Sequence, residues 1–320
     1  MVDSKKQWKA WLYLSPAIIL LLIFTVWPII NTIRVSFVVD YNQLAAIGGT
    51  KFRVGFDNYI NIVKYPGFRN CLVNTLVLCF LTVPLSTMIA LIIAACLNSI
   101  KPLSRLFQTI YFLPYVTNSI AIGMVFAAMF SMVGSFIGTD HAVIQTYGIV
   151  NTVIQFFGGK PINWVNDNAA DTFMTKLPNY MVLVIYIVWN ALPFKILILL
   201  GGLQSVNKQY YDAAKVDGTS RFRVFWRITV PLLSPMIAYV VITGFIGGFK
   251  EYSSVVGIFG ETMGPVGTNF RTNMNTMVGL IYDNISGNQG RASAAALILF
   301  LIIFAVTLVN LYVSKKRVHY

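Results

Sequence analysis

Charged residues are scarce in this sequence. Asp, Glu, Lys and Arg make up only 11% of its 320 residues, and the mean hydropathy is +0.69. A soluble domain carries roughly a quarter of its residues as charged side chains, because its surface faces water. The shortage therefore excludes an ordinary soluble domain and indicates a chain that lies within a membrane.

Residues that bind metals or act as nucleophiles are also few. The two histidines, His141 and His319, do not stand at a metal-binding spacing, and the three cysteines, Cys71, Cys79 and Cys96, form no C-x-x-C pair. The chain also lacks the G-x-S-x-G nucleophile pattern and the G-x-x-x-x-G-K-[ST] phosphate loop. We therefore expect no catalytic residue, no metal site and no cofactor in this chain. If ATP drives the protein, another chain must hydrolyse it.

Long apolar stretches dominate what remains. Each is close to the ~20 residues that a helix needs to cross a bilayer. The stretches cover residues 11–33, 71–97, 106–132, 177–203, 232–257 and 292–314. They predict an all-α integral membrane protein with six transmembrane helices in a single domain, 1–320. The first stretch is not expected to be a cleaved signal peptide, because Trp27 and Pro28 stand where small residues would precede the cleavage site.

Positive charge is distributed unevenly over the connecting segments. If the N-terminus is cytoplasmic, the inner segments carry a large excess of Lys and Arg over acids, whereas the outer segments are nearly balanced. This asymmetry follows the positive-inside rule, so we expect a multi-pass protein with both termini in the cytoplasm. The pI of 9.7 is then explained by orientation in the lipid bilayer, and no nucleic acid partner is expected.

The most polar inner segment, residues 204–231, carries five positive charges between Lys208 and Arg227. Asn207 can cap a first short helix, Gly218 can end it in a left-handed conformation, and Thr219 can cap a second. Pro231 can start the next membrane helix. Taken alone, the segment is more typical of an ordinary basic cytoplasmic loop, since such loops of membrane proteins are enriched in Lys and Arg.

The spacing within this segment resembles the EAA loop of bacterial ABC importer permeases. Asp212-Ala213-Ala214 is followed after three residues by Gly218, and after nine more by Ile228-Thr229-Val230-Pro231. Asp212 replaces the usual Glu and Val230 the usual Leu. The resemblance implies that residues 204–231 form a cytoplasmic coupling loop that docks on an ATPase subunit. The implied coupling residues are Asp212, Ala213, Ala214, Gly218, Arg223, Arg227, Ile228 and Pro231.

Matches in the same order run along nearly the whole chain, including Gly201-Gly202-Leu203-Gln204-Ser205 and Gly290-Arg291-Ala292-Ser293-Ala294. They are closest to the carbohydrate branch of type I importers. The resemblance implies a permease in the bacterial inner membrane, paired with a second, related permease, most often a different chain. It also implies two ABC ATPase subunits, which bind the ATP and Mg, and an extracytoplasmic solute-binding protein on the loops at 38–70, 133–176 and 258–290.

A few polar residues fall within the apolar stretches. By helical rise, Lys195 lies roughly 12 Å and Glu251 roughly 25 Å from the inner face, which argues against a direct ion pair. Intramembrane charges usually face a cavity, although Glu251 near an outer mouth could simply be solvated. The family resemblance implies a substrate path at Trp189, Asn190, Phe194, Lys195, Gly248, Phe249, Glu251 and Tyr252.

Alternative functions remain open at this stage. An ion-coupled secondary transporter needs intramembrane acids, of which the sequence offers only Glu251. A membrane scaffold or receptor would transport nothing. Within the importer class, the solute could be a sugar or oligosaccharide, or else glycerol 3-phosphate or another acidic compound that Lys195 would suit.

Overall fold

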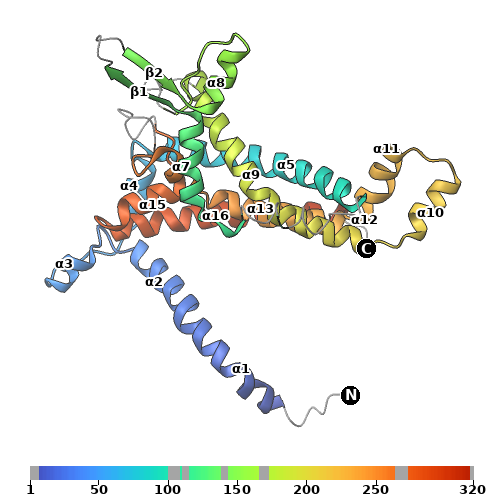
Figure 1. The fold of residues 1–320 in the computed structure, drawn as a ribbon. Coiled ribbons are helices and arrows are strands. Elements are labelled where there is room, and N and C mark those ends of the chain that lie inside the picture. Colours follow the sequence, from blue (N-terminus) through green and yellow to red (C-terminus); the bar gives the residue numbers. More distant parts are fainter. Residues whose placement is uncertain are drawn as a thin grey trace. The chain divides into compact units, whose positions relative to one another are not determined.

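The computed structural model describes residues 7–99, 109, 115–137, 143–165, 173–263 and 273–317. The chain is mostly helical, as predicted (Figure 1). It divides into two compact units, which we describe separately. One unit contains Met1–Tyr65 and Leu280–Phe300, and the other contains Pro66–Gly279 and Leu301–Tyr320.

The first unit and the start of the second contain α1 (Gln7–Leu21), α2 (Trp27–Ser36), α3 (Gln43–Ile47), α4 (Asp57–Val63) and α5 (Phe68–Ser99). The chain continues with α7 (Ser119–Phe130), β1 (Met132–Ile137), β2 (Val143–Tyr147), α8 (Ile149–Phe156), α9 (Phe173–Ser205), α10 (Gln209–Val216), α11 (Arg221–Val224), α12 (Val230–Leu232), α13 (Ser234–Phe249), α14 (Ser253–Phe259), α15 (Met277–Ile285) and α16 (Gln289–Arg317). Two π-helical segments, Leu22–Val26 and Phe225–Thr229, join α1 to α2 and α11 to α12.

Four helical stretches are long and apolar enough to cross a membrane: Trp8–Ser36, Phe68–Ser99, Lys176–Ser205 and Gln289–Lys316. They coincide with the first, second, fourth and sixth predicted spans. A bent pair of helices, Arg221–Leu232 and Ser234–Phe249, provides a fifth if it is counted as one span. The predicted third span, 106–132, lies partly outside the described residues, and its described part is the shorter apolar helix α7. The count of six helices therefore stays a prediction.

The predicted fifth span, 232–257, is not one continuous helix. The chain bends by 70° before Ser234, so the membrane helix α13 starts there, with Pro235 in its first turn, and not at Pro231 as predicted. The helix then stops at Phe249, and α14 begins at Ser253. The hydroxyl of Thr276 donates to the carbonyl of Glu251 (2.8 Å), and the Glu251 carboxylate accepts from the Ser254 N–H (3.1 Å). These bonds satisfy backbone groups that a continuous helix would have paired internally.

The long loop after α7 departs from the all-helical prediction. Residues Met132–Ile137 and Val143–Tyr147 pair as an antiparallel hairpin, with an irregularity between Val133 and Ser135. Val, Ile, Phe, Thr and Tyr make up half of the first strand and most of the second, and these residues favour extended backbone.

Two long helices, α5 and α9, pack side by side and form the centre of the second unit (Figure 1). The buried residues of α5 recur every three or four positions, as a helix with one packed face requires. In the C-terminal part of α5, the side chains of Ala90, Leu91 and Ala94 pack with Leu199, Leu200 and Leu203 of α9. The helix α13 packs against α5, and α14 packs against α7.

The contact between α7 and α14 is unusually close, because glycines face each other. A methyl carbon added to Gly123 would lie 2.7 Å from the Cα of Gly257, and one added to Gly257 would lie 2.9 Å from the Cα of Gly123. Only glycine permits two backbones to approach to this distance. The crossing holds α14 against α7.

Candidate functional site

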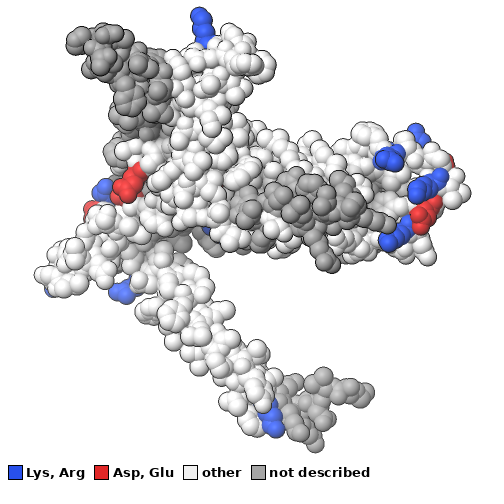
Figure 2. Space-filling model, in the orientation of Figure 1, with Lys and Arg blue, Asp and Glu red and all other residues white. Residues whose placement is uncertain are grey.

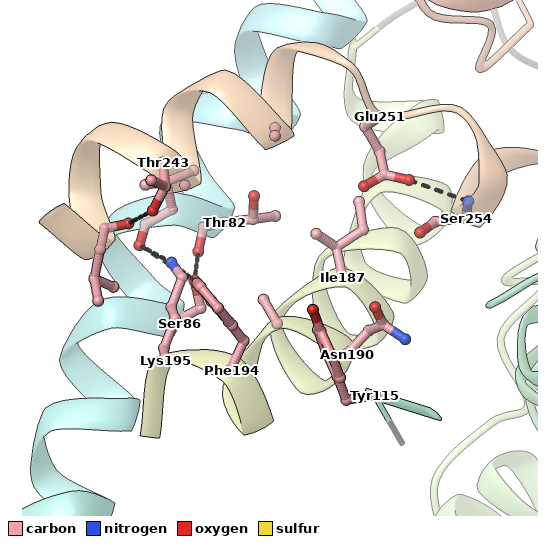
Figure 3. Close-up of a pocket in the computed structure, with 16 residues that line it drawn as sticks. Thr82, Ser86, Tyr115, Ile187, Asn190, Phe194, Lys195, Thr243, Glu251 and Ser254 are labelled. Carbon is pink, nitrogen blue, oxygen red and sulfur yellow. Dashed lines mark hydrogen bonds between the residues drawn. The ribbon is translucent and has the colours of Figure 1, made fainter. Parts of the chain in front are cut away.

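A cavity of about 320 Å³ lies among α5, α9, α13 and the start of α14 (Figure 3). Five of the predicted substrate-path residues line it: Asn190, Phe194, Lys195, Gly248 and Glu251. Its size is at the lower end of the range for small-molecule pockets, roughly 300–1,000 Å³. Its walls combine aliphatic side chains and glycines with two aromatic rings, several hydroxyls, an amide and one charge of each sign.

Lys195 is almost completely buried, with 4% of its surface exposed. Its ammonium donates to three acceptors on α5: the hydroxyl of Ser86 (2.7 Å), the hydroxyl of Thr87 (3.0 Å) and the carbonyl of Val83 (3.2 Å). A cation inside a membrane protein needs such acceptors, because lipid offers none. Lys195 therefore ties α9 to α5.

Glu251 lines the same cavity from the break between α13 and α14. Its carboxylate accepts from the N–H of Ser254, which stabilises the first turn of α14. Among the described residues the ion pairs are Arg53–Asp57 and Arg291–Asp40, so Lys195 and Glu251 share a cavity without forming a pair. The absence of this pair was expected from their different depths.

One wall of the cavity is aromatic. The rings of Tyr115 and Phe194 are stacked, with 6.0 Å between their centroids and 17° between their planes. The other predicted aromatic residues lie elsewhere. Trp189 packs with Phe126 (5.3 Å), Phe249 is buried beside Phe80 (6.3 Å), and Tyr252 packs against the buried cluster around α9.

Several lining residues were not among the predicted ones, namely Thr82, Ser86, Tyr115, Thr243 and Ser254. A sequence signal existed for one group only. Thr82 and Ser86 stand four residues apart within an otherwise apolar stretch, which places them on one face of a membrane helix. Tyr115, Thr243 and Ser254 carry no comparable pattern.

The predicted coupling loop folds as two short helices, α10 and α11, around a turn at Gly218. Gly218 has a φ of 63°, the left-handed conformation expected from the sequence. Lys208, and not Asn207 as predicted, directly precedes α10, although the side chain of Asn207 accepts from the N–H of Gln209 (3.0 Å). The prediction for Thr219 was wrong: Ser220 precedes α11, whose first turn has no side-chain cap.

The coupling loop exposes both charge and apolar surface. Lys and Arg gather over α10 and α11, with two aspartates among them (Figure 2). Of the predicted coupling residues, Asp212, Ala213, Gly218, Arg223 and Arg227 are exposed, Ala214 is buried, and Ile228 and Pro231 are half-buried. The side chains of Val216 and Phe222 are 88% and 76% exposed. Exposed apolar side chains that stand among charged ones are suited to a protein–protein contact.

Comparison with known proteins gives relatives over nearly the full length. The sequence pattern of the family described as "Binding-protein-dependent transport system inner membrane component" matches residues 86–319. The lactose transport system permease protein LacF of Rhizobium radiobacter is 27% identical over 310 residues, which cover 96% of this chain and 94% of the relative. The arabinooligosaccharides transport system permease protein AraP of Halalkalibacterium halodurans is 30% identical over 304 residues, 94% of this chain and 86% of the relative.

Among solved structures, the fold matches that of a bacterial ABC transporter involved in the import of the acidic polysaccharide alginate. The TM-score is 0.74 with 20% sequence identity, over 98% of this chain and 97% of the other. At this identity the likeness concerns the fold, which is that of an ABC importer permease.

Proposed function

Since the chain belongs to the family of binding-protein-dependent transport system inner membrane components, we propose that it lines the path of a saccharide across the bacterial inner membrane. The observation that carries the proposal is the cavity among α5, α9 and α13. A sugar offers apolar C–H faces and many hydroxyls. The stacked rings of Tyr115 and Phe194 can pack against the C–H faces, and Asn190 and Glu251 can hydrogen-bond the hydroxyls.

The relatives support the same class of solute. Their names refer to lactose and to arabinooligosaccharides, and both cover nearly all of this chain. At about 320 Å³ the cavity is at the lower end of the size range of small-molecule pockets, so an oligosaccharide would extend beyond it. We expect the remaining surface to come from a second permease, which is a different chain in our proposal.

ATP would be bound and hydrolysed, with Mg, by two separate ATPase subunits that dock on the loop 204–231. The exposed Val216 and Phe222 offer the apolar contact, and the surrounding Lys and Arg fix its orientation. In this proposal both termini are cytoplasmic, because the basic loop then lies inside. Movement of the ATPases would shift α10 and α11 as a rigid body and change the side to which the cavity opens.

On the opposite face, we expect a solute-binding protein to dock. The hairpin β1–β2 and the helix α8 belong to the predicted outer loop 133–176, the longest connection between spans. Long loops on the surface are frequent binding sites.

Replacing Gly218 by valine tests the coupling. A β-branched residue at φ 63° is strained by about 1–3 kcal/mol, so the turn between α10 and α11 should rearrange. In cells that also produce the partner subunits, the variant should lose the ATPase from pull-downs and take up labelled oligosaccharide at least tenfold more slowly. Gly201→Ala is the matched control, because a methyl there meets nothing within 4 Å. Normal uptake by the Gly218 variant would refute the docking.

A second measurement separates the importer from an ion-coupled transporter. Uptake should persist when an ionophore collapses the ion gradients at constant cellular ATP. It should stop when ATP is depleted at constant gradients. The reverse result would identify a secondary transporter, and unchanged uptake after deletion of the gene would leave only a scaffold or receptor.

A further inference from the structure

The cavity contains one cation and one anion, and their hydrogen bonds decide which of them can meet a solute. Lys195 comes from α9 and Glu251 from the break after α13 (Figure 3). If the ammonium were available, the cavity would suit an acidic solute. If the carboxylate were available, it would suit a solute with hydrogen-bond donors and no negative charge.

The ammonium of Lys195 has no hydrogen left to donate. It carries three N–H groups and donates to three acceptors on α5, at 2.7, 3.0 and 3.2 Å. The hydroxyls of Ser86 and Thr87 direct their own hydrogens to carbonyls one turn earlier on the same helix, at 2.5 and 2.7 Å. Their lone pairs therefore face Lys195, and the arrangement is complete without a solute.

The carboxylate of Glu251 is in the opposite situation. One oxygen, Oε1, accepts from the N–H of Ser254, and the other, Oε2, has no hydrogen-bond partner among the described residues. Because Glu251 is only half-buried and lines the cavity, Oε2 can accept from a molecule inside it. Asn190 also lines the cavity, and within the described part of the chain its amide is unpartnered too.

We propose that Glu251 determines the charge class of the solute: it accepts hydrogen bonds from hydroxyl or amine groups of the saccharide and repels saccharides that carry carboxylates. In the same proposal, Lys195 is a link between α5 and α9 and not an anion site. The inference rests on the proposed function and deepens it. It also separates this chain from the transporter of the same fold that imports acidic alginate, since a shared fold does not determine the charges that face the solute.

The test measures binding to the purified assembly of permeases and ATPases without the solute-binding protein, so that the selectivity of that protein plays no part. The probes are matched pairs: neutral galacto-oligosaccharides and oligogalacturonates of equal length, followed by saturation-transfer NMR. We expect the wild type to bind the neutral member at least tenfold more tightly. Glu251→Gln keeps an oxygen for the Ser254 N–H but removes the charge. The ratio of the two dissociation constants, acidic over neutral, should therefore fall at least fivefold.

Two further variants separate the alternatives. Glu261→Gln is the matched control. It removes the same charge ten residues further along the chain, and Glu261 is exposed and does not line the cavity. Its ratio should equal that of the wild type. Lys195→Met should lower the melting temperature but leave the ratio within twofold. Gel filtration of each variant shows whether the assembly is intact.

Each result has a defined meaning. Tighter binding of the acidic member by the wild type, or a change of the ratio in Lys195→Met and not in Glu251→Gln, would overturn the inference while the saccharide function stands. If an intact and ATPase-active assembly binds neither member of any pair, the proposed function itself fails, and the inference fails with it.

Discussion

Replacing Gly257 by alanine should push α14 away from α7. The added methyl would lie 2.9 Å from the Cα of Gly123 and 2.9 Å from the carbonyl oxygen of Ile120. Both neighbours are backbone atoms, so neither can move aside as a flexible side chain would. Because Ser254 lies on α14 and holds the Glu251 carboxylate, the displacement would also disturb the cavity.

The size of the effect follows from the geometry. Non-bonded carbon atoms prefer to stay about 3.5–4.0 Å apart, so the helices must separate by roughly 0.6–1.1 Å. A gap of this size removes about a quarter to a half of the dispersion attraction at each neighbouring contact. Together with the typical cost of overpacking, we expect a loss of about 1–3 kcal/mol of stability.

The melting temperature of the detergent-solubilised protein, followed by fluorescence-detected gel filtration, measures this loss. We expect Gly257→Ala to melt several degrees lower, at about 2–4 °C per kcal/mol. Gly247→Ala is the control: Gly247 is also a helical glycine, but a methyl there meets nothing within 4 Å. That variant should melt at the wild-type temperature or slightly above it, because alanine favours helix. Equal melting of the two variants would refute the close crossing of α7 and α14.

Two further predictions concern buried amides. Asn74 donates to the carbonyls of Asn273 and Asn275 (3.0 and 2.8 Å) and accepts from the hydroxyl of Tyr180, so Asn74→Leu removes three hydrogen bonds, each worth roughly 0.5–1.5 kcal/mol. Tyr180→Phe removes only one of these three bonds, and its melting temperature should fall less; an equal fall would contradict the assignment. Asn151 is fully buried and bonds both backbone groups of Ile162, so in Asn151→Ala the amide of Ile162 should exchange its hydrogen at least tenfold faster. Unchanged exchange would show that the loop holds without it.

The sequence by itself determined the membrane class and the positions of most spans. In lipid every backbone N–H and C=O must be paired within the protein. A helix pairs them within one segment, so an apolar stretch of ~20 residues predicts a membrane helix. The turn at Gly218 was predictable for a similar local reason, since glycine is the residue that adopts a positive φ at little cost. The resemblance to the EAA loop between Asp212 and Pro231 could be recognised from the sequence because the whole motif lies within one short segment.

Only the tertiary structure decided where the fifth span breaks and that, of the two charged groups lining the cavity, Lys195 has all its hydrogens bonded to α5. The break depends on Thr276, which lies 25 residues after Glu251 in the chain and donates to its carbonyl. The hydrogen bonds of the Lys195 ammonium depend on Ser86 and Thr87, which lie 109 and 108 residues before it on another helix. Hydropathy and periodicity describe neighbours along one segment, whereas a buried charge is satisfied by whatever the packing of helices brings beside it.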